Sequence, residues 1–142
     1  MLDVSQPRVA LADTNVFVAL FAGPSHSSHE ASLGLFGRVA EGDLSLIVTP
    51  VIVAELVYAC ETVLRWSRPV ISNRLASLLG ADGLSLREPL AVLTALELYG
   101  RTSKLDFADA YLAGAALTDG PPTVASFDRD FDIIEGVQRV AA

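Results

Sequence analysis

The stretch VALADTN, residues 9–15, joins four apolar residues to an acid, a hydroxyl and an amide. A short, continuous apolar run is typical of a β-strand that is buried on both faces of a sheet. Asp and Asn also end strands and cap the helices that follow, so one junction of this kind has a purely structural explanation. Whether Asp13 also has a chemical role depends on what the rest of the chain places beside it.

Composition points to one soluble domain. The chain has 142 residues, the usual size of a domain with its own core, and we expect a single domain over residues 1–142. Hydrophobic residues make up 51% of the chain, yet every apolar run is shorter than the roughly 20 residues that a membrane span needs. The N-terminus lacks the pattern of a secretion signal, and the single cysteine, Cys60, can form no internal disulfide. We therefore expect a cytoplasmic protein without a membrane anchor.

The charge is distributed unevenly along the chain. A net charge of −7 is unfavourable, taken alone, for binding nucleic acid. Residues 65–104, however, carry six basic residues against three acidic ones, whereas the rest of the chain carries four against fourteen. Arg65, Arg68 and Arg74 in this middle segment either line a path for RNA or cover a solvated helix surface. A group of carboxylates that binds cations would account for part of the acidity elsewhere.

Strand-like and helix-like segments alternate from one end of the chain to the other. We expect strands at 8–12, 44–49, 83–88, 122–128 and 137–140, and helices at 15–21, 28–41, 49–66, 67–80, 89–100 and 106–120. Thr49 before Pro50 is a helix cap followed by a proline in the first turn, and Asp106 is a cap for the helix that follows it. This alternation predicts an α/β fold in which helices cover both faces of a parallel sheet.

Four carboxylates fall where such a fold gathers ligands. Asp13 follows the first strand and Asp128 follows the fourth. Glu55 lies in the second turn of the helix after the second strand, and Asp109 lies in the first turn of the helix before the fourth. Because ligands of open parallel sheets bind beyond the carboxyl ends of the strands, we expect these four side chains to meet.

Each acid also has a structural explanation when it is taken singly. Asp109 suits the positive end of a helix dipole, and Asp106 is explained as a cap. Glu55 follows Val51 and precedes Tyr58 on an apolar helix face, so it is paired, protonated, bound to metal or at the wetted margin of that face. Asp130 and Asp132 are expected in a solvated turn. The arrival of four acids from separate segments at one sheet edge favours a site.

Carboxylates without partnered Cys or His ligands suit a hard divalent cation, Mg²⁺ or Mn²⁺. Such ions neutralise the acids, activate water and stabilise the leaving oxygen when a phosphodiester bond is cleaved. Metal loading also removes the difficulty that the net charge raises, because the site attracts phosphate only after it has bound the cation.

Four segments with acidic residues follow one another in the chain: LADTNVFVALF, TPVIVAELVYA, DFADAYLAGAAL and VASFDRDFD. In these segments the chain resembles the PIN-domain ribonucleases over residues 9–132, and especially the VapC-type toxins of prokaryotic toxin–antitoxin pairs. The resemblance implies a three-layer α/β/α sandwich around a central, mostly parallel sheet of four to five strands. It also implies an endoribonuclease that uses Mg²⁺ or Mn²⁺, an RNA substrate, a homodimer and a small antitoxin protein as partner.

The resemblance assigns roles to residues one by one. The carboxylates it makes catalytic are Asp13, Glu55, Asp109 and Asp128, and the metal ligands among them are Asp13, Asp109 and Asp128. Its supporting positions are Thr14, Asn15, Asp106, Ser126 and Asp130.

Three other functions are weighed against this one. An aspartate-nucleophile phosphatase needs a second acid two residues after the first, where this chain has Asn15. A phospho-acceptor receiver domain needs a lysine late in the chain, and none follows Lys104. A catalytically silent domain of the same fold, acting as a binding or regulatory module, stays open at the level of sequence.

Overall fold

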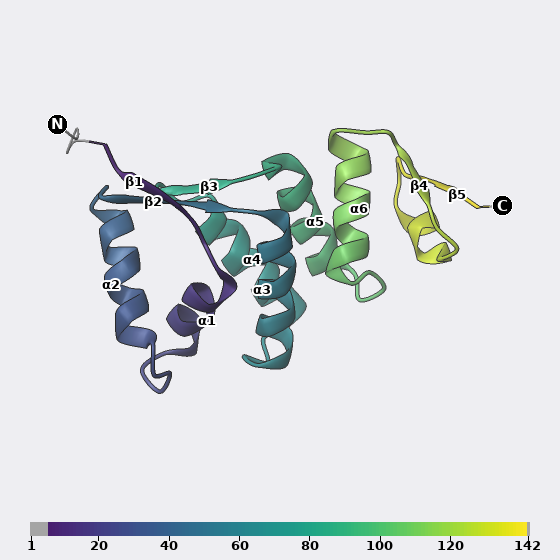
Figure 1. The fold of residues 1–142 in the computed structure, drawn as a ribbon. Coiled ribbons are helices and arrows are strands. Elements are labelled where there is room, and N and C mark those ends of the chain that lie inside the picture. Colours follow the sequence, from purple (N-terminus) through teal and green to yellow (C-terminus); the bar gives the residue numbers. More distant parts are fainter. Residues whose placement is uncertain (1–5, 142) are drawn as a thin grey trace. The chain divides into compact units, whose positions relative to one another are not determined.

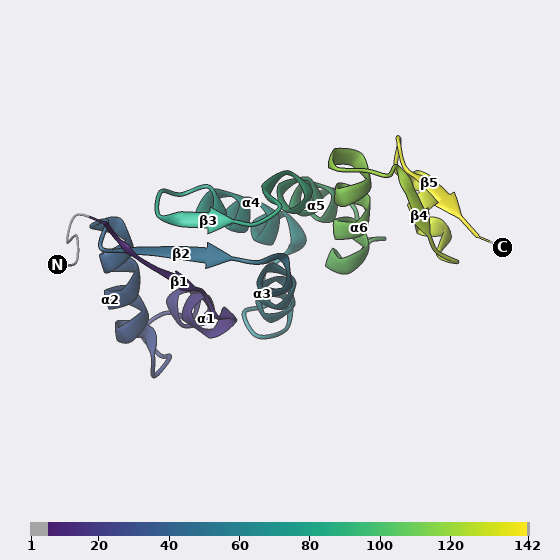
Figure 2. The ribbon, with the colours of Figure 1, turned by 45° about the horizontal axis from the view of Figure 1, so that its top comes forward.

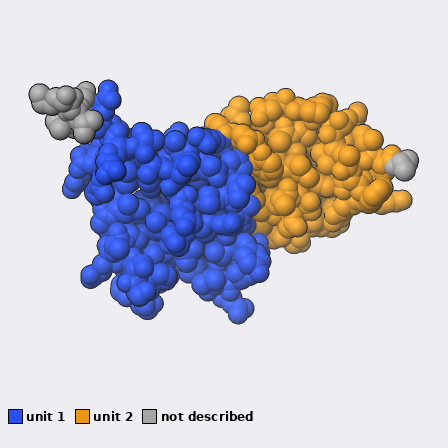
Figure 3. Space-filling view, in the orientation of Figure 1, with its two compact units in different colours: residues 1–66, 77–87 blue, residues 67–76, 88–142 orange. Residues whose placement is uncertain are grey.

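The computed structural model describes residues 6–141, which form five strands, six α-helices and one 3₁₀-helix (Figure 1). In chain order these are β1 (Arg8–Leu11), α1 (Thr14–Ala22), α2 (His29–Ala40), β2 (Leu44–Val48), α3 (Pro50–Thr62), α4 (Arg68–Leu79), β3 (Leu84–Leu86), α5 (Pro89–Arg101), α6 (Phe107–Thr118), β4 (Thr123–Ala125), the 3₁₀-helix η1 (Arg129–Ile133) and β5 (Gln138–Val140). The described residues divide into two compact units (Figure 3). The first unit comprises those up to Trp66 together with Ser77–Arg87, and the second comprises Ser67–Ala76 together with those from Glu88 onward.

The expected elements are all present, with ends that differ by a few residues. Thr49 caps α3 as expected, because its hydroxyl accepts a hydrogen bond from the Ile52 N–H at 3.4 Å, and Pro50 opens the helix. The helix ends at Thr62, earlier than the expected residue 66. The reason lies just beyond, where Arg65 adopts a left-handed backbone (φ 59°) through which no α-helix can continue.

Three parallel strands form the sheet of the first unit, with β2 between β1 and β3 (Figure 2). The central strand supplies much of the core, since Leu44, Leu46 and Val48 are all buried. Helices α1 and α2 pack together through Phe17 and Phe36, whose ring centroids are 5.5 Å apart. These contacts fix the start of α1, and with it the residues that follow β1.

Strand β1 lies at the edge of this sheet. Val9, which is opposite Ser45 of β2, is 63% exposed, and Leu11 is 66% exposed. Only Ala12, just after the strand, is buried. The expectation of a strand buried on both faces is therefore wrong for β1, because Val9 and Leu11, which lie on the same face of the strand, are both exposed.

Helices α5 and α6 pack closely in the second unit. Gly114 of α6 makes this approach possible, because a Cβ there would lie 2.5 Å from the Ala91 carbonyl oxygen of α5. The buried Tyr99 ring meets Phe107 edge-on, with ring centroids 6.3 Å apart. Strands β4 and β5 form a parallel pair, with Val124 buried beneath it.

These observations confirm the predicted α/β class, and every strand pair in the described residues is parallel. The five strands form a sheet of three and a sheet of two. The expectation of a single domain over residues 1–142 stays a prediction. Within residues 6–141 no helix combines the length and the apolar character needed to cross a membrane.

Candidate functional site

Asp13 lies at the N-cap of α1, one residue after the buried Ala12. Its backbone is extended (φ −91°, ψ 152°), as an N-cap residue requires, but its side chain makes no capping hydrogen bond. The carboxylate is exposed. Helix capping therefore does not explain why this position is an acid, and the side chain is left for other chemistry.

Glu55 is held by the residue next to Asp13. The Thr14 hydroxyl donates a hydrogen bond to Glu55 Oε2 at 2.7 Å, which ties the start of α1 to the second turn of α3. Glu55 is exposed, and so are Val51 (67%) and Tyr58 (68%) along the same face of α3. Of the alternatives that the sequence left open, the structure shows a solvent-exposed carboxylate oriented by a hydroxyl.

Asp106 and Asp109 lie at the start of α6. Asp106 is the N-cap, and its Oδ1 accepts a hydrogen bond from the Asp109 N–H at 2.9 Å, as the sequence predicts. The Asp109 carboxylate lies in the first turn of the helix and is half-buried. One hydrogen bond at the start of α6 thus holds the Asp106 carboxylate beside the backbone of Asp109.

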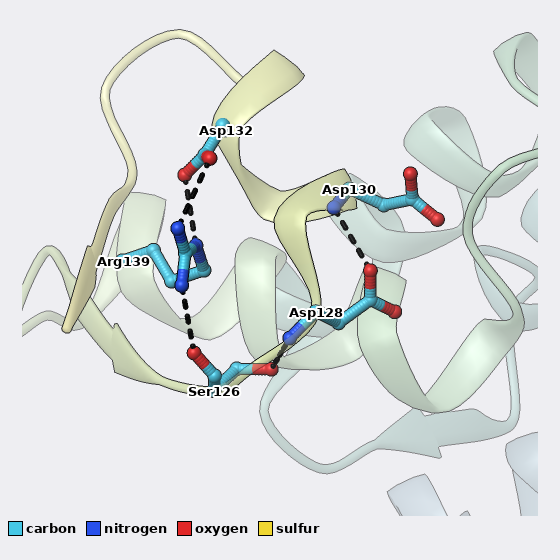
Figure 4. Close-up of polar contacts among 5 residues, drawn as sticks. All are labelled: Ser126, Asp128, Asp130, Asp132 and Arg139. Carbon is cyan, nitrogen blue, oxygen red and sulfur yellow. Dashed lines mark hydrogen bonds and ion pairs between the residues drawn. The ribbon is translucent and has the colours of Figure 1, made fainter. Parts of the chain in front are cut away.

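Asp128 begins the 3₁₀-helix η1 (Figure 4). Strand β4 ends at Ala125, so Asp128 does not follow the strand directly as expected, and two residues intervene. The Ser126 hydroxyl accepts from the Asp128 N–H at 2.9 Å, and the Asp128 carboxylate accepts from the Asp130 N–H at 2.9 Å. The tight turn that these two bonds form keeps the side chains of Asp128 and Asp130 close together.

Asp132 is separated from this group by an ion pair. Its carboxylate accepts hydrogen bonds from Nε and Nη2 of Arg139, at 3.0 and 3.3 Å. Figure 4 shows Asp132 turned toward Arg139, on the other side of the turn from the carboxylates of Asp128 and Asp130. Asp132 is exposed to solvent, as expected, and it also has a charged partner from β5.

The remaining acids of the second unit interact electrostatically. Partial burial raises the pKa of Asp109 above its usual value, and the neighbouring charge and hydrogen bond of Asp106 raise it further. The charges of Asp128 and Asp130 act in the same direction. Asp106, Asp109, Asp128 and Asp130 form what we call the acid cluster. Within residues 6–141, no ion pair neutralises any of its members.

The carboxylate and hydroxyl oxygens of these residues are the kind of ligand that a hard divalent cation prefers. Their arrangement does not yet form a binding site, because in residues 6–141 no three His, Cys, Asp or Glu side chains are grouped so that they could hold a metal ion. The excess negative charge in the acid cluster is what a cation would relieve.

The single cysteine is not part of this chemistry. Cys60 is fully buried in α3. Burial, and to a smaller extent the charge of Glu61, raises the pKa of its thiol to about 11. Since the thiolate is the nucleophile, a thiol with this pKa does not react near neutral pH.

The parallel strands and the helices that alternate with them place the protein in the α/β class, with carboxylates at several helix starts. The family model for the PIN domain matches residues 10–137, and the chain belongs to this family. PIN domains are typically metal-dependent nucleases that act on RNA or other nucleic acid. A comparison with curated proteins finds no match.

The structure brings the predicted site residues together in two groups. Asp13 and Glu55 belong to the first unit, where Thr14 links them; Asp109 and Asp128 belong to the second, within the acid cluster. Asn15 is exposed at the second position of α1. That all four carboxylates meet at one place stays a prediction.

Two arginines were not identified as site neighbours from the sequence. Arg139 pairs with Asp132, and the signal available was a basic residue in the strand after an acidic turn. Arg68 binds the connection before Asp106, and no sequence pattern predicts this contact, because the groups that accept its hydrogen bonds are backbone carbonyls.

Proposed function

We propose that this protein is an endoribonuclease that depends on Mg²⁺ or Mn²⁺ and cleaves RNA phosphodiester bonds. Asp13, Glu55, Asp109 and Asp128 are its catalytic carboxylates in this proposal. The observation that carries it is the acid cluster, in which partial burial and then the charges of the neighbouring aspartates raise the pKa of Asp109. Carboxylates gathered in one place repel one another, and a bound cation relieves that repulsion.

The metal ligands in this proposal are Asp13 from the first unit and Asp109 and Asp128 from the second. Asp106 and Asp130 support them through water, since both carboxylates lie beside a proposed ligand. When bound, the divalent ion compensates the carboxylate charge and supplies Lewis-acid stabilisation to the phosphodiester oxygens.

The side chains of the protein supply orientation and proton transfer. Thr14 donates to Oε2 of Glu55, which leaves Oε1 free to accept the proton of the water that attacks phosphorus. The Ser126 hydroxyl fixes the turn that carries Asp128, and thereby limits where that carboxylate can point. Asn15 supports the site from the first turn of α1 in this proposal.

A more specific role is that of a VapC-type toxin, which works as a homodimer and is held inactive by a small antitoxin protein. The order of the acidic motifs along the chain supports this assignment. Exposed apolar side chains support the protein partners, since α3 exposes Val51 and Tyr58 and β1 exposes Val9 and Leu11. Growth arrest on expression, relieved by the product of a short neighbouring gene, would test the toxin role, and the molar mass in solution would test the dimer.

The decisive experiment measures cleavage of an unstructured RNA by the wild type with Mg²⁺, with Mn²⁺ and with EDTA. We expect cleavage with either metal, none with EDTA, and a large loss in Asp109→Asn. Asp132→Asn is the matched control, because it is the same change in the same unit at an acid that Arg139 neutralises. RNA binding without cleavage under all conditions would indicate a silent binding module instead, and cleavage that persists in EDTA would overturn the mechanism.

A further inference from the structure

Arg68 directs its guanidinium at backbone carbonyls. Its Nη1 donates to the Thr102 oxygen at 2.8 Å, to the Tyr99 oxygen at 3.4 Å and, at short range, to the Leu105 oxygen. Its guanidinium carbon lies 4.4 Å from the centre of the Tyr99 ring. Within residues 6–141, Arg68 forms no ion pair with a carboxylate. The side chain therefore acts on the main chain of one particular segment.

That segment is the connection between α5 and α6. Helix α5 ends at Arg101 and α6 begins at Phe107. The last carbonyls of a helix have no partner within it, and Arg68 satisfies two at this end, those of Tyr99 and Thr102. The third carbonyl belongs to the fully buried Leu105, which is the residue directly before Asp106. One side chain thus ties the two ends of the connection together.

Arg68 also acts on the residue after Asp106. Its guanidinium stacks on Tyr99, and the Tyr99 ring packs edge-on against Phe107, the first residue of α6. The neighbours of Asp106 on both sides, Leu105 and Phe107, are therefore fixed by contacts that lead back to Arg68. Asp106 itself is exposed, and its carboxylate accepts a hydrogen bond from the Asp109 N–H.

We propose that Arg68 is a positioning residue for the acid cluster. By holding the Leu105 carbonyl and the Tyr99 ring, it fixes the backbone of Asp106 and so the spacing between the carboxylates of Asp106 and Asp109. The effect on metal binding rests on the proposed function, whereas the effect on the backbone does not. An arginine suits this task because its planar group can stack and donate at the same time, which an ammonium cannot.

The test compares Arg68→Met with Arg101→Met in the full chain. Arg101 is the matched control, since it is the last residue of α5, the helix whose end Arg68 binds, and it forms an exposed ion pair of 3.9 Å with Glu97. Without metal, we expect the Asp109 amide hydrogen to exchange on the order of tenfold faster in Arg68→Met, because the Asp106 cap loosens. In Arg101→Met this exchange rate should equal that of the wild type.

The second measurement is the Mn²⁺ concentration that gives half-maximal RNA cleavage. We expect this concentration to rise about 10- to 100-fold in Arg68→Met, while the rate at saturating Mn²⁺ recovers to within a few fold of the wild type. A merely structural role would lower the melting temperature and the maximal rate without changing the metal requirement. Arg68→Lys keeps the charge but lacks the planar group, so we expect the same faster exchange of the Asp109 amide and the same raised Mn²⁺ requirement as in Arg68→Met. This variant serves as the test if Arg68→Met does not fold.

The two proposals fail in different ways. If the wild type neither binds Mn²⁺ nor cleaves RNA, the nuclease proposal fails and the exchange comparison still tests Arg68. If the wild type is a metal-dependent nuclease but the Arg68 variants match Arg101→Met in both measurements, the positioning role of Arg68 is overturned.

Discussion

The two groups of acids in this protein are organised in opposite ways. In the first unit, Asp13 and Glu55 come from different elements, and the hydroxyl of Thr14, which follows Asp13 in the chain, donates a hydrogen bond to Glu55. In the second unit, four aspartates gather around one helix end and one tight turn, where partial burial and then the charges of Asp106, Asp128 and Asp130 raise the pKa of Asp109. A neutral hydroxyl orients one carboxylate of the first group, whereas the carboxylates of the second group repel one another, and a cation would relieve that repulsion.

The sharpest way to break this comparison is to remove one carboxylate from each group. Asp13→Asn and Asp109→Asn should each reduce RNA cleavage by at least about 100-fold, since even residues that only support a metal ligand contribute 10- to 100-fold. Because the two act on one ion in our proposal, the double variant should be little worse than either single variant. Single-turnover cleavage rates of the three variants measure this. Full activity in either single variant would remove that residue from the site.

Metal binding should stabilise the folded protein. At a Mn²⁺ concentration about 100-fold above the dissociation constant, we expect a gain of about 2.7 kcal/mol and a rise in melting temperature of roughly 5–15 °C. Thermal melts with Mn²⁺ and with EDTA measure it. Asp109→Asn should lose most of this rise, and Asp132→Asn should keep it. If Asp13→Asn keeps the full rise as well, the second unit alone holds the ion.

Thr14→Val removes the donor that orients Glu55 while keeping the shape of the side chain. An exposed hydrogen bond of this kind contributes about 1 kcal/mol, so we expect cleavage to fall about fivefold. Thr14→Ser keeps the hydroxyl and should stay within about twofold of the wild type. Steady-state cleavage rates at saturating metal give the comparison, and equal rates in the Val and Ser variants would show that Glu55 needs no such orientation.

The smallest effect concerns the stability of the metal-free protein as a function of pH. The pKa of Asp109 is raised in the folded state, so the folded protein holds this proton more tightly than the unfolded chain does. The resulting contribution to stability is fully present below the unfolded pKa and is lost as the pH rises through the folded pKa. The Asp109→Asn variant does not lose stability in this way as the pH rises, so in EDTA at neutral pH this variant should be at least as stable as the wild type.

Urea unfolding in EDTA, at a series of pH values from the acid range to neutrality, checks this prediction. Asp13→Asn is the comparison from the first unit. A clear loss of stability in Asp109→Asn at neutral pH would mean that the carboxylate has a structural role instead.

Periodicity and helix signals in the sequence were sufficient to predict the fold class and the elements. The caps at Thr49 and Asp106 could be predicted because they depend on residues only three positions away. The exposure of β1 could not be predicted, because the apolar run at residues 8–12 indicates a strand but does not determine which other elements cover that strand.

The candidate site was predictable where the chemistry is local to a strand or helix end. The places of Asp13 and Asp109 at helix starts were predicted in this way, and their role in a site stays a prediction. The ion pair of Asp132 was missed because its partner Arg139 approaches from another strand. The contacts of Arg68 were missed for a related reason, since backbone carbonyls are present at every residue and carry no sequence pattern.

The buried Cys60 makes distance spectroscopy practical in this protein. Its thiol is shielded and reacts slowly, so probes attached to cysteines introduced on the surface would label those positions alone, in an otherwise unaltered chain. One probe near Ala108 and another near Phe127, both exposed in the second unit, would report in solution the distance between the helix start and the tight turn that carry the acid cluster. A change in that distance on addition of Mn²⁺ would be direct physical evidence that the cluster responds to the ion.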